Sequence, residues 1–118
     1  MVLIGHSNDI EPRVYHDGEG VLHVEKRMLV GPGDGAPTFS MRRFTVGAGG
    51  CTPYHTHPWE HEVYVLAGRG EVRFADASRS VAPGDFVFVP PNDEHQFVNT
   101  GEEAFEFLCI VPLDGEGG

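Results

Sequence analysis

Short apolar runs rich in Val, Phe, Tyr and Leu follow one another along the chain, separated by clusters of turn-forming residues. Apolar and polar residues alternate within several runs, and almost no segment keeps the 3.6-residue period of an amphipathic helix. This pattern is typical of an all-β sandwich or barrel. The expected strands cover residues 21–30, 38–46, 51–57, 62–67, 71–75, 86–89, 95–98 and 104–111, with a shorter strand at 78–82.

Clusters of Gly, Pro, Asn and Asp mark the breaks between these strands, because such residues accept a positive φ or fix φ near −65°. The clusters lie at 31–35, 47–50, 68–70, 83–85, 90–93 and 99–101. With 118 residues and no linker or repeat, the pattern predicts one domain over residues 1–118. Residues 1–20 are expected to form an edge strand or an arm that pairs with a second subunit, and residues 114–118 a flexible tail.

The composition and charge of the chain argue against some classes of binding partner. The formal net charge of −10 argues against a nucleic-acid groove or an anionic membrane surface. No apolar run approaches the roughly 20 residues of a membrane helix, and residues 1–10 contain no hydrophobic signal segment. Cys51 and Cys109 do not form a CxxC pair, as expected for reduced thiols in the cytoplasm. We therefore expect a cytoplasmic protein with a small-molecule partner and no nucleic-acid or membrane partner.

Three histidines gather around one expected strand end. His55 and His57 stand two residues apart, so they share a face of a strand. Pro58 ends that strand, and the short connection after it lets His61 return at the start of the next strand. Neutral imidazoles suit Mn, Fe, Ni, Cu and Zn. His95 opens a further strand just after a tight turn, so these four histidines together predict a divalent transition-metal site.

The two histidine segments resemble the paired motifs of the cupin family. The first motif is matched by Gly49, His55, His57, position 61 and Gly68. The second motif is matched by Gly84, Pro90, His95 and Asn99, with Asn92 in place of a glycine. The motifs span residues 49–99, and the resemblance implies a single-domain cupin, a double-stranded β-helix or jelly-roll barrel. The replacement at Asn92 is mild because asparagine tolerates the left-handed conformation.

Position 61 departs from the family pattern, in which this position is usually Glu. Counting back six intervening residues from Gly68 reaches His61 rather than Glu62. Strand alternation agrees, because His61 shares a face with Val63 and Val65. A one-residue slip would turn Glu62 inward and flip the whole strand. The sequence therefore favours His61 as the third ligand.

The stretch His55–Val63, together with Phe105–Pro112 near the end of the chain, also resembles a narrower group of small, homodimeric, manganese-binding cupins with four histidines. This resemblance implies Mn²⁺ held by His55, His57, His61 and His95, two further water positions, and a homodimer; the histidines alone also suit Fe, Ni, Cu or Zn. It also implies that the pocket includes Arg42, Phe107 and Cys109. Arg42 could instead form a structural salt bridge, and Cys109 could be a small core residue. Trp59 either covers the site entrance or packs at the barrel rim.

A metal-dependent enzyme is the leading functional expectation, with oxygenase or other oxidoreductase activity on a small, partly apolar organic molecule. Lewis-acid isomerase, lyase or decarboxylase chemistry is one alternative, although no acid–base residue can be placed in the pocket. The other is a non-catalytic barrel that binds or senses a small molecule or metal, because a fold does not settle function. Since imidazoles must be neutral to bind a metal, release is expected as the pH falls through about 6.

Overall fold

A computed structural model describes residues 1–115, and within them the chain forms strands and three short 3₁₀ helices but no α-helix. The strands are β1 (Arg13–Val14), β2 (Leu22–Val30), β3 (Phe39–Cys51), β4 (His61–Ala67), β5 (Gly70–Phe74), β6 (Ala77–Val81), β7 (Phe86–Val89), β8 (Gln96–Asn99) and β9 (Phe105–Pro112). The 3₁₀ helices are Ser7–Asp9, Pro32–Asp34 and Leu113–Gly115. The all-β class predicted from the sequence is confirmed.

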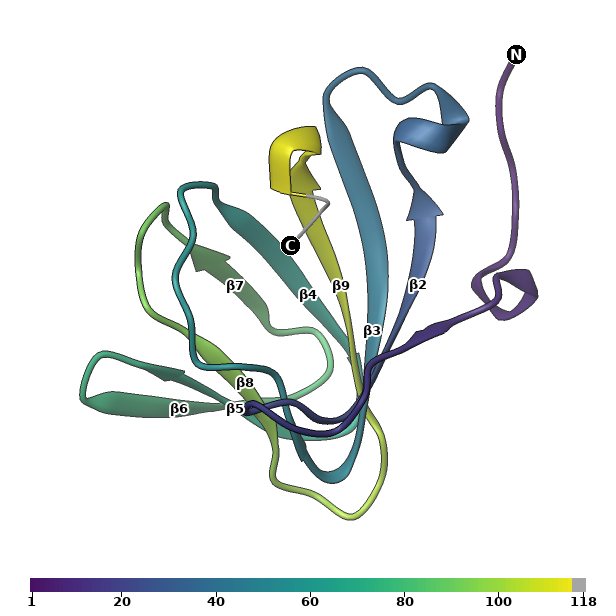
Figure 1. Ribbon diagram of the computed structural model, residues 1–118. Coiled ribbons are helices and arrows are strands. Elements are labelled where there is room, and N and C mark those ends of the chain that lie inside the picture. The colour runs from purple at the N-terminus through teal and green to yellow at the C-terminus, as the bar shows by residue number, and fades with distance from the viewer. Residues whose placement is uncertain (116–118) are drawn as a thin grey trace.

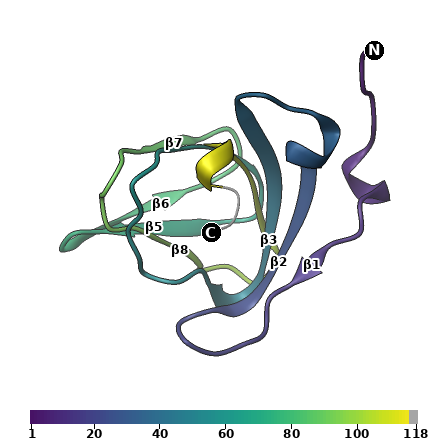
Figure 2. The same ribbon diagram turned by 45° about the horizontal axis from the view of Figure 1, so that its top comes forward.

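All strands belong to one antiparallel sheet that curls into a half-barrel. The main order is β6-β5-β8-β3-β9-β4-β7, with β2 added to β3 and β1 added to β2. In Figure 1 the sheet curls so that β5, β6 and β8 lie across from β4 and β7. Figure 2 looks toward the open side of this half-barrel, with the C-terminal turn beside the opening.

Most predicted strands match the observed ones within one residue, but the region around Cys51 differs. We expected a break at 47–50 and a new strand at 51–57; this was wrong, because β3 continues through the glycines and ends at Cys51. Opposite β2 the register shifts between Leu22 and Val24, so the glycine run forms an irregularity within the sheet. Gly50 fits there because a Cβ would lie 2.4 Å from the Leu22 carbonyl oxygen.

The core lies on the inward face of the sheet. In β9 the buried and partly buried residues alternate strictly, with Phe105, Phe107, Cys109 and Val111 pointing inward. The Phe107 ring packs against Phe97, with ring centroids 4.7 Å apart, and against Phe105 at 5.2 Å. Alternation of this kind is expected where one face of a strand packs on the core.

The N-terminal segment contains the edge strand that was one of the two forms the sequence left open. β1 is short and pairs with β2, and the residues before the first 3₁₀ helix extend away from the body (Figure 1). At the other end, Asp114 and Gly115 belong to a 3₁₀ helix. The remainder of the predicted tail, 116–118, lies outside the described residues. Within residues 1–115 no helix is both long and apolar enough to cross a membrane.

Candidate metal centre

The connection between β3 and β4 positions His55 and His57 although it is not a strand. His55 and His95 exchange two backbone hydrogen bonds of 3.1 Å, which form an isolated antiparallel bridge. The Asn92 amide donates to the His57 carbonyl oxygen at 2.8 Å. Asn92 has a φ of +68°, the left-handed conformation that its place in the second motif requires. These bonds join the two histidine segments side by side.

His61 and His95 complete the group from opposite halves of the sheet. His61 opens β4 on its inward face, together with the buried Val63 and Val65, while Glu62 lies on the other face, as strand alternation predicts. His95 directly precedes β8 and is 3% exposed. The ring centroids of neighbouring histidines lie between 4.4 and 5.1 Å apart. All four imidazoles therefore surround one small volume.

The distances between ring nitrogens suit a bound cation. Ligand atoms of His55, His57 and His95 lie within 4.8 Å of one another. The Nε2 atoms of His57 and His61 are 2.9 Å apart. Two nitrogens that bind one ion at about 2.1 Å, at a right angle to each other, are about 3 Å apart. The imidazoles of His55, His57 and His95 thus form a group that could hold a divalent transition metal, and His61 lies directly beside it through His57.

Burial keeps these imidazoles neutral. It lowers the pKa of His55 to about 4 and that of His61 to about 2, with neighbouring histidines adding to both shifts. Burial also lowers the pKa of His57 and of His95. Because a metal competes with protons for imidazole nitrogen, lowered pKa values prepare the site for binding near neutral pH.

A sulfur atom lies behind His61. The Nδ1 atom of His61 is 3.0 Å from Cys109 Sγ, and Arg42 Nη2 donates to the same sulfur at 3.1 Å. Cys109 and Arg42 are each 2% exposed. The Arg42 guanidinium also lies over the Phe44 ring, 5.1 Å from its centroid. When Nδ1 carries the ring proton and faces Cys109, the Nε2 of His61 is left to face the other histidines.

The four rings form part of the wall of a cavity of about 190 Å³, whose surface is mainly apolar. The pocket residues that the sequence suggested all lie on its wall: Arg42, Trp59, Phe107 and Cys109. Trp59 stacks on His57, with ring centroids 4.5 Å apart and planes 7° apart. A Cβ on Gly115 would lie 2.7 Å from the Trp59 ring, so the C-terminal turn packs closely over this side chain.

Sequence reasoning missed several residues of this wall. Tyr15 and Val21 come from the N-terminal region, and Gly115 from the end of the chain. No motif marks these residues, and only the path of the chain brings them to the opening. Thr52 was also missed, although its Oγ1 accepts the Phe97 amide at 2.9 Å and so helps to hold the histidine loop against β8. His6, His16 and His23 are exposed, as expected for residues outside both motifs.

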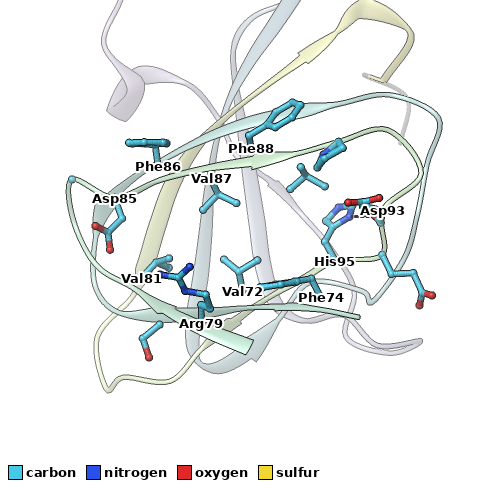
Figure 3. Close-up of a pocket in the computed structure, with 15 residues that line it drawn as sticks. Val72, Phe74, Arg79, Val81, Asp85, Phe86, Val87, Phe88, Asp93 and His95 are labelled. Atoms are coloured by element: carbon cyan, nitrogen blue, oxygen red, sulfur yellow. Dashed lines mark hydrogen bonds between the residues drawn. The ribbon is translucent and has the colours of Figure 1, made fainter. Parts of the chain in front are cut away.

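A second, larger hollow of about 550 Å³ lies between the β5–β6 hairpin and β7. Figure 3 shows Val72, Val81 and Val87 pointing into it, whereas Phe86 and Phe88 project from the opposite side of β7. Among the four candidate ligands only His95 lines this hollow. The smaller cavity is therefore the candidate site, because all four imidazoles meet there.

The chain belongs to the cupin family: the family described as Cupin domain matches residues 42–111. The match extends from Arg42 in β3 to Val111 in β9 and contains all four candidate ligands.

Three relatives show the range of proteins that this chain resembles. The polyketide cyclase RemF from Streptomyces resistomycificus has a structure with a TM-score of 0.88 and 32% identity, covering 96% of this chain and 80% of that one. The 1-methylthio-D-xylulose 5-phosphate methylsulfurylase of Rhodospirillum rubrum is 36% identical over 95 residues, 80% of this chain and 60% of the relative. A glucose-6-phosphate isomerase of Pyrococcus furiosus is 42% identical over 67 residues, 52% of this chain. The chain spans only 35% of that isomerase.

Proposed function

We propose that this chain is a metal-dependent enzyme that binds one divalent transition-metal ion through His55, His57, His61 and His95. Its substrate is a small, partly apolar molecule with a carbonyl group, and its reaction is an isomerisation or cyclisation. The observation that carries the proposal is the placement of four imidazoles of low proton affinity in the wall of a mainly apolar cavity.

A divalent ion bound by four neutral imidazoles keeps its full charge, so it supplies Lewis acidity that polarises a carbonyl oxygen and stabilises negative charge on it. Phe44, Phe97 and Phe107 line the cavity and hold the apolar part of the substrate away from water. The Arg42 side chain is buried and lies on the cavity wall, where its guanidinium can donate a hydrogen bond to an oxygen atom of the substrate. Trp59 fixes the ring plane of His57 by stacking on it.

The relatives favour Lewis-acid chemistry over oxygenation. One is named a polyketide cyclase and another a glucose-6-phosphate isomerase. Oxygenase activity was the leading expectation from sequence, and the names of these two relatives give it no support. Measuring oxygen uptake during turnover separates the two reaction types. An oxygenase consumes dioxygen as it forms product, whereas an isomerase or cyclase forms product at the same rate without dioxygen.

The nature of the metal is part of the proposal. The resemblance to four-histidine cupins favours Mn²⁺, while the general order of affinities favours Cu²⁺, Ni²⁺ or Zn²⁺ over Mn²⁺.

Neither Cys51 nor Cys109 forms a disulfide, which fits a reducing, cytoplasmic environment.

The experiment is elemental analysis of the purified protein, followed by a screen of carbonyl compounds with and without oxygen. We expect about one ion per chain, and turnover that a chelator abolishes. The substitution His61→Ala should remove the metal, whereas Glu62→Gln should retain it because Glu62 lies on the other face of β4. Loss of metal in Glu62→Gln but not in His61→Ala would contradict this ligand set. Tight retention of a compound without turnover would identify a binding protein instead.

A further inference from the structure

The cavity at the candidate metal centre is lined by aromatic side chains. The sequence contains twelve such residues, eight Phe, three Tyr and one Trp, and five of them lie on this wall. They are Tyr15, Phe44, Trp59, Phe97 and Phe107. Aromatic rings pack favourably against other rings, in offset-stacked or edge-to-face arrangements. The wall therefore favours a ligand that carries an aromatic ring over a flexible aliphatic one.

Three of these rings are held in place by one another. The Phe107 ring stacks on Phe97 and on Phe44, with ring centroids 4.7 and 5.5 Å away. Phe97 and Phe107 are 4% and 2% exposed, whereas Phe44 is only partly buried. A ligand ring can therefore pack against Phe44 without rearrangement of the core, and a wall that is already in position costs little ordering when the ligand binds.

The volume of the cavity limits the size of that ligand. An apolar cavity of about 150 Å³ in a protein core binds one benzene molecule. The cavity of this chain is about 190 Å³. The difference is little more than the roughly 30 Å³ that one water molecule occupies in the liquid. One six-membered ring therefore fits together with a small substituent such as a carbonyl group, but a second fused ring does not.

The polar groups of the wall do not suit a sugar phosphate. Proteins usually bind phosphate through several N–H donors, from Arg and Lys side chains or from the N-terminus of a helix. Among the described residues only Arg42 brings a Lys or Arg side chain to this wall, and residues 1–115 contain no α-helix. Thr52 Oγ1 already accepts from the Phe97 amide and donates to the Phe97 carbonyl oxygen. Such a wall suits a single carbonyl group better than a phosphate and a row of hydroxyls.

We propose that the substrate is an aryl ketone or aldehyde whose single aromatic ring lies in the cavity against Phe44, with its carbonyl oxygen toward Arg42 and the four imidazoles. This substrate class rests on the proposed function for its reaction at the carbonyl group. Binding of the ring depends on the chain's own aromatic wall, so it does not need the metal. Sugar phosphates are excluded by the polar groups of the wall, and fused-ring ketones by its volume.

Trp59 supplies the signal for the test, because it is the only tryptophan in the sequence and lies on the cavity wall. Its indole N–H gives a single resonance in a ¹⁵N-correlated NMR spectrum. Chelator-treated protein, and the same protein reloaded with Zn²⁺, are titrated with acetophenone, with its fused two-ring analogue acetonaphthone, and with glucose 6-phosphate. We expect acetophenone to bind with a dissociation constant of about 1 mM or lower, and the other two at least about tenfold more weakly. Acetonaphthone is the more apolar ketone, so unspecific binding would give the opposite order.

Enlarging the cavity should change which ketone binds better. Phe44→Ala removes a ring from the wall, so it should tighten acetonaphthone by about tenfold or more and weaken acetophenone. Val21→Ala enlarges the same wall by a smaller change at a partly buried position and should act in the same direction. The matched control is Phe74→Ala, which changes an exposed phenylalanine on β5 outside this cavity. It should bind both ketones as the unmodified protein does.

Equal or tighter binding of acetonaphthone or glucose 6-phosphate by the unmodified protein overturns this substrate class. Failure of acetophenone to bind either form of the protein overturns it as well, even if Zn²⁺ is taken up, and leaves the metal centre unaffected. Acetophenone binding by a protein that takes up no Zn²⁺ has the reverse meaning, because the ring site then stands and the metal-dependent function fails.

Discussion

Cys109 contacts the imidazole of His61, one of the proposed metal ligands, through its sulfur atom. Its sulfur lies 3.0 Å from His61 Nδ1 and receives a hydrogen bond from Arg42. Side chains in this position set the orientation of the imidazole and the nitrogen that carries its proton. Cys109 therefore acts on His61 in addition to filling space in the core.

This role predicts that Cys109→Ala weakens metal affinity by about 10- to 100-fold, the usual effect of removing such a partner. Competition with a chromogenic chelator measures the affinity. Cys109→Ser should retain more of it, because a hydroxyl can still accept from His61. Cys51→Ser serves as the control, since Cys51 does not line the candidate cavity. Equal affinity in Cys109→Ala and the unmodified protein would show that Cys109 only fills space.

The pKa shifts predict how metal affinity depends on pH. Four imidazoles with an ordinary pKa of 6.5 would lose about 10⁴-fold in affinity between pH 7 and 5.5. Here burial lowers the pKa of His55 to about 4 and that of His61 to about 2, so protons compete weakly in this range. We expect a loss smaller than about 100-fold, with release at lower pH than the value near 6 expected from sequence. Isothermal titration at several pH values measures this change.

The same shifts predict the acid stability of the metal-free protein. The folded-state pKa of His55 is lowered below the unfolded value, so the unfolded chain binds more protons as the pH falls below about 6.5. Stability is therefore highest above that pH and decreases toward pH 4. Thermal unfolding in the presence of a chelator should show Tm falling over this interval. A Tm that is constant from pH 7 to 5 would contradict the lowered pKa values.

At the residue scale, the spacing of the histidines in the sequence predicted that the four lie close together. It did not predict the contact between His61 and Cys109. The motif positions of His57 and His95 can be counted along the chain. The contact of Cys109 with His61 depends on the pairing of β4 with β9, where Val63 stands opposite Cys109. Val63 and Cys109 are 46 positions apart in the chain, and no local pattern specifies that register.

At the scale of the elements, two glycines with positive φ differ in how closely other atoms pack around them. Gly68 has a φ of +78°, and a Cβ there would lie 2.2 Å from the Ala104 carbonyl oxygen. Gly84 has a φ of +94°, and a Cβ there would have no neighbour within 4 Å. The two positions therefore share the backbone conformation and differ in the space around it.

Gly84→Ala should cost about 1–2 kcal/mol, the cost of a left-handed conformation for a residue with a Cβ. Gly68→Ala should cost at least about 2 kcal/mol more, because the backbone of Ala104 must also move. Urea denaturation of the two variants gives both free energies of unfolding. Equal losses would mean that the turn after β4 can move away from Ala104 without cost.

The connection after β3 shows where prediction of elements failed. Gly47 to Gly50 favoured a turn because glycines are common in turns. They lie inside β3 instead, since only glycine at position 50 allows the Leu22 carbonyl to approach so closely. The strand therefore ends later, and His55 is placed by its bridge to His95 rather than by a strand of its own. A turn and an irregular strand share the same glycine-rich composition, so the sequence does not separate them.

At the scale of the whole molecule, metal binding should stabilise the fold by mass action. An ion at about 100 times its dissociation constant adds about 2.7 kcal/mol to the free energy of unfolding. For a chain of 118 residues this raises Tm by roughly 10 °C. Scanning calorimetry with and without the ion measures the shift, and His55→Ala provides the control that should not respond. No shift in the unmodified protein would contradict a site formed only in the folded state.

The paired backbone of His55 and His95 has a consequence for the order of events during refolding. These residues are forty positions apart in the chain, and their bridge joins the β3–β4 connection to the segment before β8. An unfolded chain therefore offers a passing ion only scattered imidazoles, and capture waits until distant strands have docked. In a stopped-flow experiment the signal of the bound metal should lag behind the recovery of tryptophan fluorescence, and excess ion should slow unfolding more than it speeds refolding.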